Sequence, residues 1–391
     1  MTRAPINPDL LRWARERAGK EQEELAHRFP KLPEWEAGKG QPTLKQLEAF
    51  AKAVHVPVGY LFLPEPPEES VPLPDFRTFA GQAVRRPSPE LLDTIYTCQE
   101  RQSWYRDFVR IAGEPKLNFV GSATVAVPAE TVAKDMRAKL GFDLEARRTC
   151  PTWTDALRLF IRQAEAAGVL VMASSIVRTN THRRLDPGEF RGFALSDPLA
   201  PLVFVNGADT KAAQMFTLAH ELAHLWLGAS ALTNLGIVPA AGFRREEVWC
   251  NAVAAELLAP LPAVRSELQA DEPLEDTLAR LARTFKVSTL VILRRLLDAQ
   301  WIGRDTFDAA WDEELARLRE LARQQERARK EAGGGADFYR TTLSRVSRRF
   351  ARALVVSTLE GQTLYRDAYR MLGVSKNETF EKLAHEVGVS G

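Results

Sequence analysis

Cysteine is scarce in this sequence. Only three occur in 391 residues, at Cys98, Cys150 and Cys250. An odd number of widely spaced cysteines excludes a disulfide framework and is typical of a reducing compartment. An apolar run of about 18 residues, the length that spans a membrane, is also absent, and the first residues have no apolar signal core. We therefore expect a soluble, cytoplasmic protein that makes no use of a membrane.

An excess of one charge sign is absent as well. The chain has 53 basic and 51 acidic residues, which leaves a formal net charge of +2. Such a small excess gives no global electrostatic reason to expect nucleic-acid or membrane binding. Apolar residues make up 45% of the sequence, so the chain is long and apolar enough for two or three domains with a sizeable core.

Histidine is scarce too, yet two of the six lie in one segment, FTLAHELAHLWLG at residues 216–228. His220 and His224 are four residues apart and therefore share one helix face, where both can reach one metal ion. Glu221 lies about 100° further round the helix, which places it beside a metal-bound water. Zinc with three protein ligands lowers the pKa of that water towards ~7, and a nearby carboxylate can take its proton. The pattern predicts a metal-binding helix with Glu221 as general base.

The third metal ligand has to come from elsewhere, and the five-residue pattern alone recurs in unrelated helices. No further histidine follows until close to the C-terminal end, so we expect a carboxylate on a following helix. The segment RREEVWCNAVAAELLAP at residues 244–260 offers Glu247, which shares a helix face with Asn251. Position alone does not separate Glu247 from Glu246, and Glu256 is a further possibility.

Residues 190–260 resemble the ImmA/IrrE family of bacterial zinc metallopeptidases. The resemblance lies in a strand that ends in asparagine (VFVN, 203–206), the helix FTLAHELAH, and the later pattern E-x-x-x-N-x-x-A-A-x-L-L-x-P. In that family the glutamate four residues before the asparagine is the third metal ligand, which implies Glu247 here. The family's usual FAAELLMP is VAAELLAP in this chain, a difference at packing positions only.

The resemblance implies a zinc-dependent endopeptidase of regulatory type, with His220, His224 and Glu247 holding Zn²⁺. Glu221 would act first as base and then as acid towards the departing amine. The implied partner is a protein substrate, an XRE-type transcriptional repressor or an antitoxin. Mn²⁺ or Fe²⁺ can occupy similar sites, so the metal stays open. The alternative function is a DNA-binding transcription regulator or antitoxin-like module whose metal domain senses or stabilises without cutting.

The segment before the metal-binding helix predicts two strands, at residues 190–195 and 201–205, with a turn between them. A strand beside such a helix often holds an extended substrate by backbone pairing. We therefore expect a substrate site at residues 190–196. Its predicted members are Phe190, Arg191, Gly192, Phe193 and Asn206, and the Asn206 side chain also closes the turn into the helix.

Residues 1–63 predict four or five short helices and resemble an XRE-type helix-turn-helix domain through LLRWARERAG, EQEELA and WEAGKGQPTLKQLEAFA. The stretch from Ala26 to Trp35 is about one turn short of that pattern, and Phe29 to Trp35 has two prolines, so the recognition helix that normally enters the DNA major groove is shortened. Ten basic and eight acidic residues in 1–62 are a weak balance for gripping phosphates. We interpret this part as a helical scaffold or protein-docking domain rather than a sequence-specific DNA binder.

Composition predicts the remaining boundaries. Residues 64–90 contain seven prolines and form a stiff linker. Residues 91–310 form a zincin-like metallopeptidase domain with flanking helices, a small β-sheet and the metal-binding helix. A charged helix and the run Gly333–Gly335 make a hinge at 311–335, and residues 336–391 predict a helical C-terminal region. The predicted fold class is thus mostly α (α+β).

Overall fold

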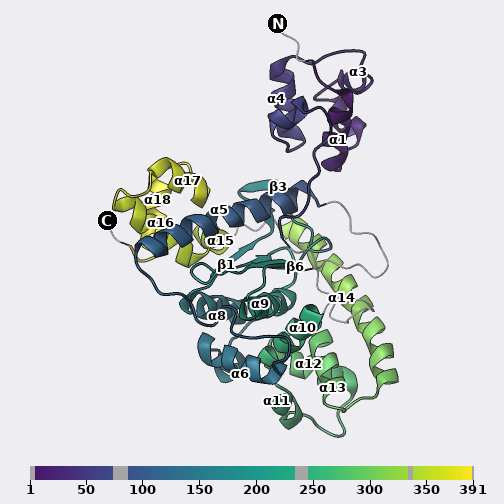
Figure 1. The fold of residues 1–391 in the computed structure, drawn as a ribbon. Helices are drawn as coiled ribbons and strands as arrows, with labels where there is room; N and C mark the ends of the chain where they lie inside the picture. The colour runs from purple at the N-terminus through teal and green to yellow at the C-terminus, as the bar shows by residue number, and fades with distance from the viewer. Residues whose placement is uncertain (1–4, 74–86, 234–244, 333–337, 390–391) are drawn as a thin grey trace. The chain divides into compact units, whose positions relative to one another are not determined.

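The computed structural model describes residues 5–73, 87–233, 245–332 and 338–389. The chain divides into two compact units, residues 1–72 with 83–96, and residues 73–82 with 97–391 (Figure 1). Residues 74–86 of the predicted proline-rich linker and the run Gly333–Gly335 lie outside the described residues. The chain is mostly helical with a small mixed sheet, which confirms the predicted α+β class.

The first unit is a group of short helices around an apolar core. Its elements are α1 (Pro8–Arg17), α2 (Gln22–Ala26), α3 (Leu32–Glu36), α4 (Leu44–Ala53) and the 3-10 helix η1 (Val58–Phe62). Leu10, Trp35 and Phe50 are among the buried side chains of this core. Helix α3 forms despite Pro33 because that proline lies in the first turn, where no backbone N–H is required. At five residues it is too short to act as an ordinary recognition helix.

The second unit is built on a four-stranded sheet in the order β1-β5-β4-β6. Its strands are β1 (Leu170–Ser174), β4 (Gly192–Leu195), β5 (Leu202–Asn206) and β6 (Ala231–Thr233). Strand β1 is parallel to β5, and the other pairs are antiparallel. Every residue of β4 and β5 is buried, because helices cover both faces of the sheet (Figure 1). A separate hairpin joins β2 (Ile176–Val177) to β3 (Asn180–Arg184).

Helix α9 (Lys211–Leu227) is the centre of the second unit. Thirteen consecutive residues, from Gln214 to Trp226, are buried, as expected for a helix surrounded by other elements. The Thr210 side chain caps its first turn, and Gly228 ends it in the left-handed conformation (φ 71°). The last carbonyls accept hydrogen bonds from a preceding loop, Gly121 N to Leu225 O at 3.0 Å and Ala123 N to Trp226 O at 2.9 Å.

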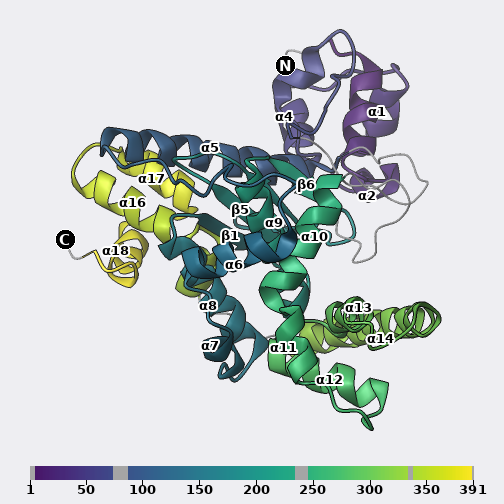
Figure 2. The ribbon, with the colours of Figure 1, turned by 60° about the horizontal axis from the view of Figure 1, so that its bottom comes forward.

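The remaining helices of this unit surround α9 and the sheet. They are α5 (Pro89–Ile111, in this unit from Thr97), α6 (Ala129–Leu140), α7 (Leu144–Arg148), α8 (Trp153–Ala166), α10 (Arg245–Leu258), α11 (Leu261–Ser266), α12 (Leu274–Phe285), α13 (Thr289–Asp298) and α14 (Arg304–Ala332). Helix α10 packs on α6 and α9, and α11 to α14 follow it (Figure 2). No helix in the described ranges is long and apolar enough to cross a membrane.

The C-terminal residues form a compact helical group against the sheet. Its helices are α15 (Phe338–Val346), α16 (Arg348–Leu359), α17 (Tyr365–Leu372) and α18 (Asn377–Glu386). Helices α15 and α16 pack against β1, so they cover the β1 edge of the sheet (Figure 1). Buried Phe350 and Leu354 of α16 supply part of the apolar contact.

Candidate metal centre

Helices α9 and α10 bring together the three predicted metal ligands. His220 and His224 lie one turn apart on α9, and Glu247 lies in the first turn of α10. The two Nε2 atoms are 3.1 Å apart. Glu247 Oε2 lies 3.2 Å from His220 Nε2, and Glu247 Oε1 lies 3.0 Å from His224 Nε2. All three side chains are buried, and we call this group of ligand atoms the ligand triangle.

The dimensions of the ligand triangle fit a small divalent metal ion. Nitrogen and oxygen ligands about 2.0–2.1 Å from a tetrahedral zinc ion lie roughly 3.3 Å from one another. The observed separations of 3.0 to 3.2 Å are close to that value. His220 Nδ1 lies 3.0 Å from Asn251 Oδ1, an acceptor, so Nδ1 carries the proton and Nε2 presents its lone pair to the triangle.

The charges within the ligand triangle are strongly coupled. Burial alone would raise the pKa of Glu247, but the two neighbouring histidines lower it to about 2. Burial lowers the pKa of His220, but the Glu247 carboxylate outweighs this effect and raises that pKa above 6.5. Burial lowers the pKa of His224 below 6.5. Without a metal, an ionised Glu247 therefore holds a proton on His220, and a metal ion takes the place of that proton.

Glu221, the predicted general base, is fully buried on α9 next to β4. A Cβ atom added at Gly192 would lie 3.1 Å from Glu221 Oε1, 2.6 Å from Thr217 Cγ2 and 2.8 Å from the Phe204 carbonyl oxygen. Only glycine fits there without a shift of the backbone or of Thr217. The absence of a side chain at Gly192 thus allows the strand to pass directly beside the Glu221 carboxylate.

The structure places the predicted substrate strand inside the sheet. Residues 192–195 pair with β5 on one side, and residues 192–194 pair with β6 on the other, so their backbone groups are not available for a substrate. Phe190 and Phe193 are completely buried in the sheet's aromatic packing, and Arg191 forms an ion pair with Asp209 at 3.6 Å. An extended substrate would have to add outside β6, which pairs only with β4 among the described strands.

Asn206 has a structural role at the end of β5. Its Nδ2 donates to the Phe190 carbonyl oxygen at 3.0 Å, and its Oδ1 accepts from Ala208 N at 3.0 Å. These bonds close the turn that leads into α9, as the sequence predicts. They leave the completely buried side chain no direct access to a substrate.

The alternative third ligands lie outside the triangle. Glu256, on the same helix as Glu247, forms a buried ion pair with Arg295 of α13. Glu246 is partly exposed and is not part of the His/Glu group. Only Glu247 is placed to share a metal with both histidines, within the chain that the structure describes.

Sequence reasoning missed the residues that hold α10 in place. Three arginines from other helices donate to carbonyl oxygens at its C-terminal end. Arg137 binds Glu256 O at 2.8 Å, Arg295 binds Ala259 O at 2.9 Å, and Arg147 binds Leu258 O. Cations at this end are favoured by the helix dipole. No local pattern marks these arginines, because each differs from an ordinary surface arginine only in its three-dimensional surroundings.

This ligand set is of the kind found in metallopeptidases in which two histidines on one helix and a glutamate on the next share a metal. Residues 164–297 match a peptidase family model described as the IrrE N-terminal-like domain. A stretch of 106 residues, 26% of the chain, is 34% identical to the radiation response metalloprotease IrrE of Deinococcus radiodurans and covers 32% of that protein. Residues 164–297 are therefore similar in sequence to the ImmA/IrrE family.

The C-terminal helical group matches a different family. Residues 346–386, which span α16 to α18, match a model described as a domain of unknown function. The stretch similar to the metalloprotease thus covers about a third of that protein's length. The C-terminal helical group lies beyond the residues that match the IrrE N-terminal-like domain.

Proposed function

We propose that this protein is a metal-dependent endopeptidase, with zinc as the metal. The ligand triangle is the single observation that carries the proposal, because its three buried donors have the spacing that a zinc ion requires. A divalent ion there would act as a Lewis acid that lowers the pKa of a water molecule and polarises a peptide carbonyl. His220, His224 and Glu247 would hold the ion, and Asn251 would orient the His220 ring.

Glu221 would carry the proton transfers of peptide hydrolysis. Its carboxylate would accept a proton as water oxygen bonds to the peptide carbon. It would then give that proton to the amide nitrogen as the C–N bond breaks, which releases an amine and a carboxylate. Burial of Glu221 beside β4 fixes the carboxylate in one place and limits competition from bulk water.

The substrate that we propose is a specific regulatory protein, a transcriptional repressor of the XRE type or an antitoxin. This rests on the resemblance to the ImmA/IrrE family, in which regulatory substrates are expected. Residues 1–63 would be an XRE-like domain that docks this substrate rather than DNA. Their surface has a groove of about 790 Å³, and its lining includes apolar Phe29, Trp35 and Leu44 and basic Arg28, Lys31 and Lys45. That combination suits an acidic segment with apolar side chains.

The experiment compares wild type with Glu221→Gln, both metal-loaded, in a lysate of the source cell. Mass spectrometry would detect new protein N-termini. We expect the rate of cleavage to fall roughly 10²- to 10⁴-fold in Glu221→Gln while metal content stays at one ion per chain. His220→Ala is expected to lose both metal and cleavage, and Glu246→Gln serves as a matched control with both retained.

Two results would contradict this assignment. Equal rates of cleavage by wild type and Glu221→Gln would exclude Glu221 as the general base. Metal bound at one per chain with no new N-termini in either sample would favour the alternative, a regulator whose metal domain senses or stabilises.

A further inference from the structure

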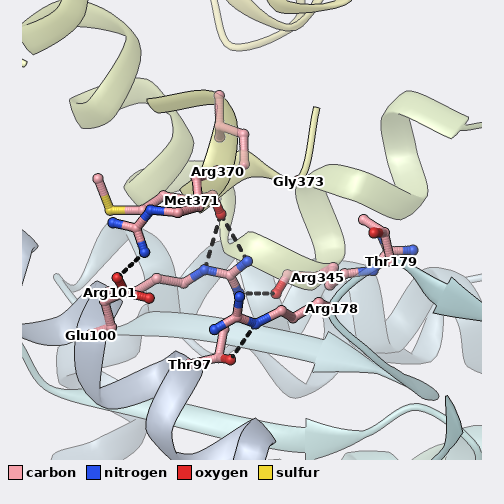
Figure 3. A pocket seen from close by; sticks show the side chains of 10 residues that line it. Thr97, Glu100, Arg101, Arg178, Thr179, Arg345, Arg370, Met371 and Gly373 are labelled. Atoms are coloured by element: carbon pink, nitrogen blue, oxygen red, sulfur yellow. Dashed lines mark hydrogen bonds and ion pairs between the residues drawn. The ribbon is translucent and has the colours of Figure 1, made fainter. Parts of the chain in front are cut away.

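A second group of charged side chains lies outside the ligand triangle, where the peptidase domain meets the C-terminal helices (Figure 3). Helix α5, the β2–β3 turn, α15 and α17 enclose a small cavity there. Four arginines line it, one from each of these elements: Arg101, Arg178, Arg345 and Arg370. Glu100 is the only acidic residue among the lining residues, so the lining carries three positive charges in excess.

The guanidinium of Arg101 forms the inner wall and is only 5% exposed. Its Nε and Nη2 donate to the Met371 carbonyl oxygen at 3.2 and 2.8 Å, and its Nη1 donates to the Arg345 carbonyl oxygen at 3.3 Å (Figure 3). These acceptors are uncharged. Burial, together with the nearby Arg178 and Arg345, therefore lowers the pKa of Arg101 to about 10.

The other three arginines differ in how their guanidinium groups are hydrogen-bonded. Arg178 donates through Nε to Thr97 Oγ1 at 3.1 Å, and its backbone is held at a φ of 50°, which is uncommon for a residue with a side chain. Arg345 Nε is buried and has no hydrogen-bond acceptor. Within the part of the chain that the structure describes, Arg370 is the one of the four with an acidic partner, Glu100. The buried Arg345 donor without an acceptor and the buried Arg101 charge, whose acceptors are all uncharged, are costly unless an anion joins them.

We propose that this cavity binds a phosphate group, either as inorganic phosphate or as the end of a small phosphomonoester. Guanidinium groups bind phosphate oxygens through paired hydrogen bonds, and two negative charges would offset most of the excess. The cavity volume is about 20 Å³, enough for one water-sized group and too small for a sugar or a base. Only one phosphate oxygen would enter the cavity, and the rest of the phosphate and of any ligand would lie at its mouth beside the exposed Arg178 and Arg370.

The phosphate would connect two parts of the chain. Arg178 belongs to the peptidase domain, within the residues that match the IrrE N-terminal-like model. Arg345 and Arg370 belong to the C-terminal helices, and Arg370 lies within the match to the domain of unknown function. Phosphate would therefore strengthen the packing of these helices on the β1 side of the sheet. This inference does not depend on peptidase activity.

The test measures phosphate binding to the full-length protein by calorimetry, in chloride buffer at constant ionic strength. The variants are Arg178→Gln and Arg345→Gln. The control is Arg366→Gln, which removes the same charge from a side chain of α17 that is 83% exposed and outside the lining. We expect one phosphate per chain in wild type and control, and a Kd raised about tenfold or more in each cavity variant, as for loss of a charged hydrogen bond.

Thermal unfolding without phosphate provides a second measurement. Each cavity variant is expected to unfold at the same temperature as wild type or higher, because it relieves repulsion among the arginines. Added phosphate should then raise the unfolding temperature of wild type and control more than that of the cavity variants. An equal rise in all four proteins would be the general effect of phosphate on protein stability and would overturn the proposal.

Other outcomes are equally decisive. No binding to wild type at about 10 mM phosphate, or equal Kd values in wild type and both cavity variants, would refute a phosphate site. Acetate that binds as tightly as phosphate would refute the phosphate class. A nucleoside monophosphate that binds more tightly than inorganic phosphate would support the site and identify a phosphomonoester as the source.

Discussion

The hydrogen bond between His220 and Asn251 gives a sharp test of how the metal centre is supported. Asn251→Ala removes the acceptor, 3.0 Å from His220 Nδ1, and leaves a buried imidazole N–H without a partner. Such a loss costs about 1–3 kcal/mol. Loss of a hydrogen bond to a metal ligand typically lowers metal affinity 10- to 100-fold, or roughly 1.4–2.7 kcal/mol. The two ranges overlap, so we expect the Kd for zinc to rise about 10- to 100-fold in Asn251→Ala.

Asn251→Asp separates hydrogen bonding from packing at the same position. The aspartate is nearly the same size and is a stronger acceptor, which raises the basicity of the imidazole. The Asn251→Asp variant should therefore bind zinc at least as tightly as wild type, and Asn251→Ala should bind it much more weakly. Competition with a chromophoric chelator at pH 7.5 measures all three, and Glu246→Gln on the same helix serves as the control.

The reasoning would be refuted if Asn251→Ala bound zinc as tightly as wild type. It would also be refuted if Asn251→Asp and Asn251→Ala lowered zinc affinity equally, because the hydrogen bond would then have no effect of its own. Circular dichroism of the metal-free proteins checks that each variant is folded.

Two further predictions concern acidity and docking. The folded-state pKa of Glu247, about 2, lies below its ordinary 4.5, so its carboxylate stabilises the metal-free protein above pH 4.5 and this contribution is lost as the pH falls towards 2. The raised pKa of His220 adds stability that is complete below pH 6.5 and is lost as the pH rises through that raised value. Urea unfolding of metal-free wild type and Glu247→Gln should differ most between pH 4.5 and 6.5, and a difference that grows steadily to pH 8 would contradict this account. Leu44→Glu adds a negative charge to the proposed docking groove, at a half-exposed helix N-terminus where a carboxylate does not disturb the helix. This variant should cleave the whole substrate several-fold more slowly than wild type but cleave a short peptide with the same bond at the wild-type rate. Equal slowing of both reactions would exclude a docking role.

The spacing of His220, His224 and Glu247 is the part of the site that sequence reasoning could place. Residues four apart on a helix must share a face, and this rule needs no knowledge of the rest of the fold. The choice of Glu247 over its neighbours came from a resemblance, because helical periodicity alone allows several carboxylates on α10. Its distances to both histidines distinguish it from Glu256, which is paired with Arg295.

The sheet shows what local patterns could not supply. The sequence pattern predicts β4 and β5 nearly in place but not β6, because the pairing of residues 192–194 with β6 depends on a segment that follows α9 in the chain. Strand β6 is three residues long and has no alternation to mark it. The hairpin residues 180–184 are polar and mostly exposed, which is typical of a loop, yet they form β3. Which strand lies at an edge is a property of the whole sheet.

The three arginines at the C-terminal end of α10 have a consequence for the comparison of relatives. The histidines are positioned by the sheet and α8, whereas Glu247 is positioned through α10 by side chains on α6, α7 and α13. A relative that exchanged one of these distant arginines could keep both histidines, the general base and the third-ligand glutamate in its sequence and still hold that glutamate out of reach of the histidines. An intact motif therefore identifies ancestry more securely than it identifies a working enzyme, and the anchoring arginines should be inspected alongside it.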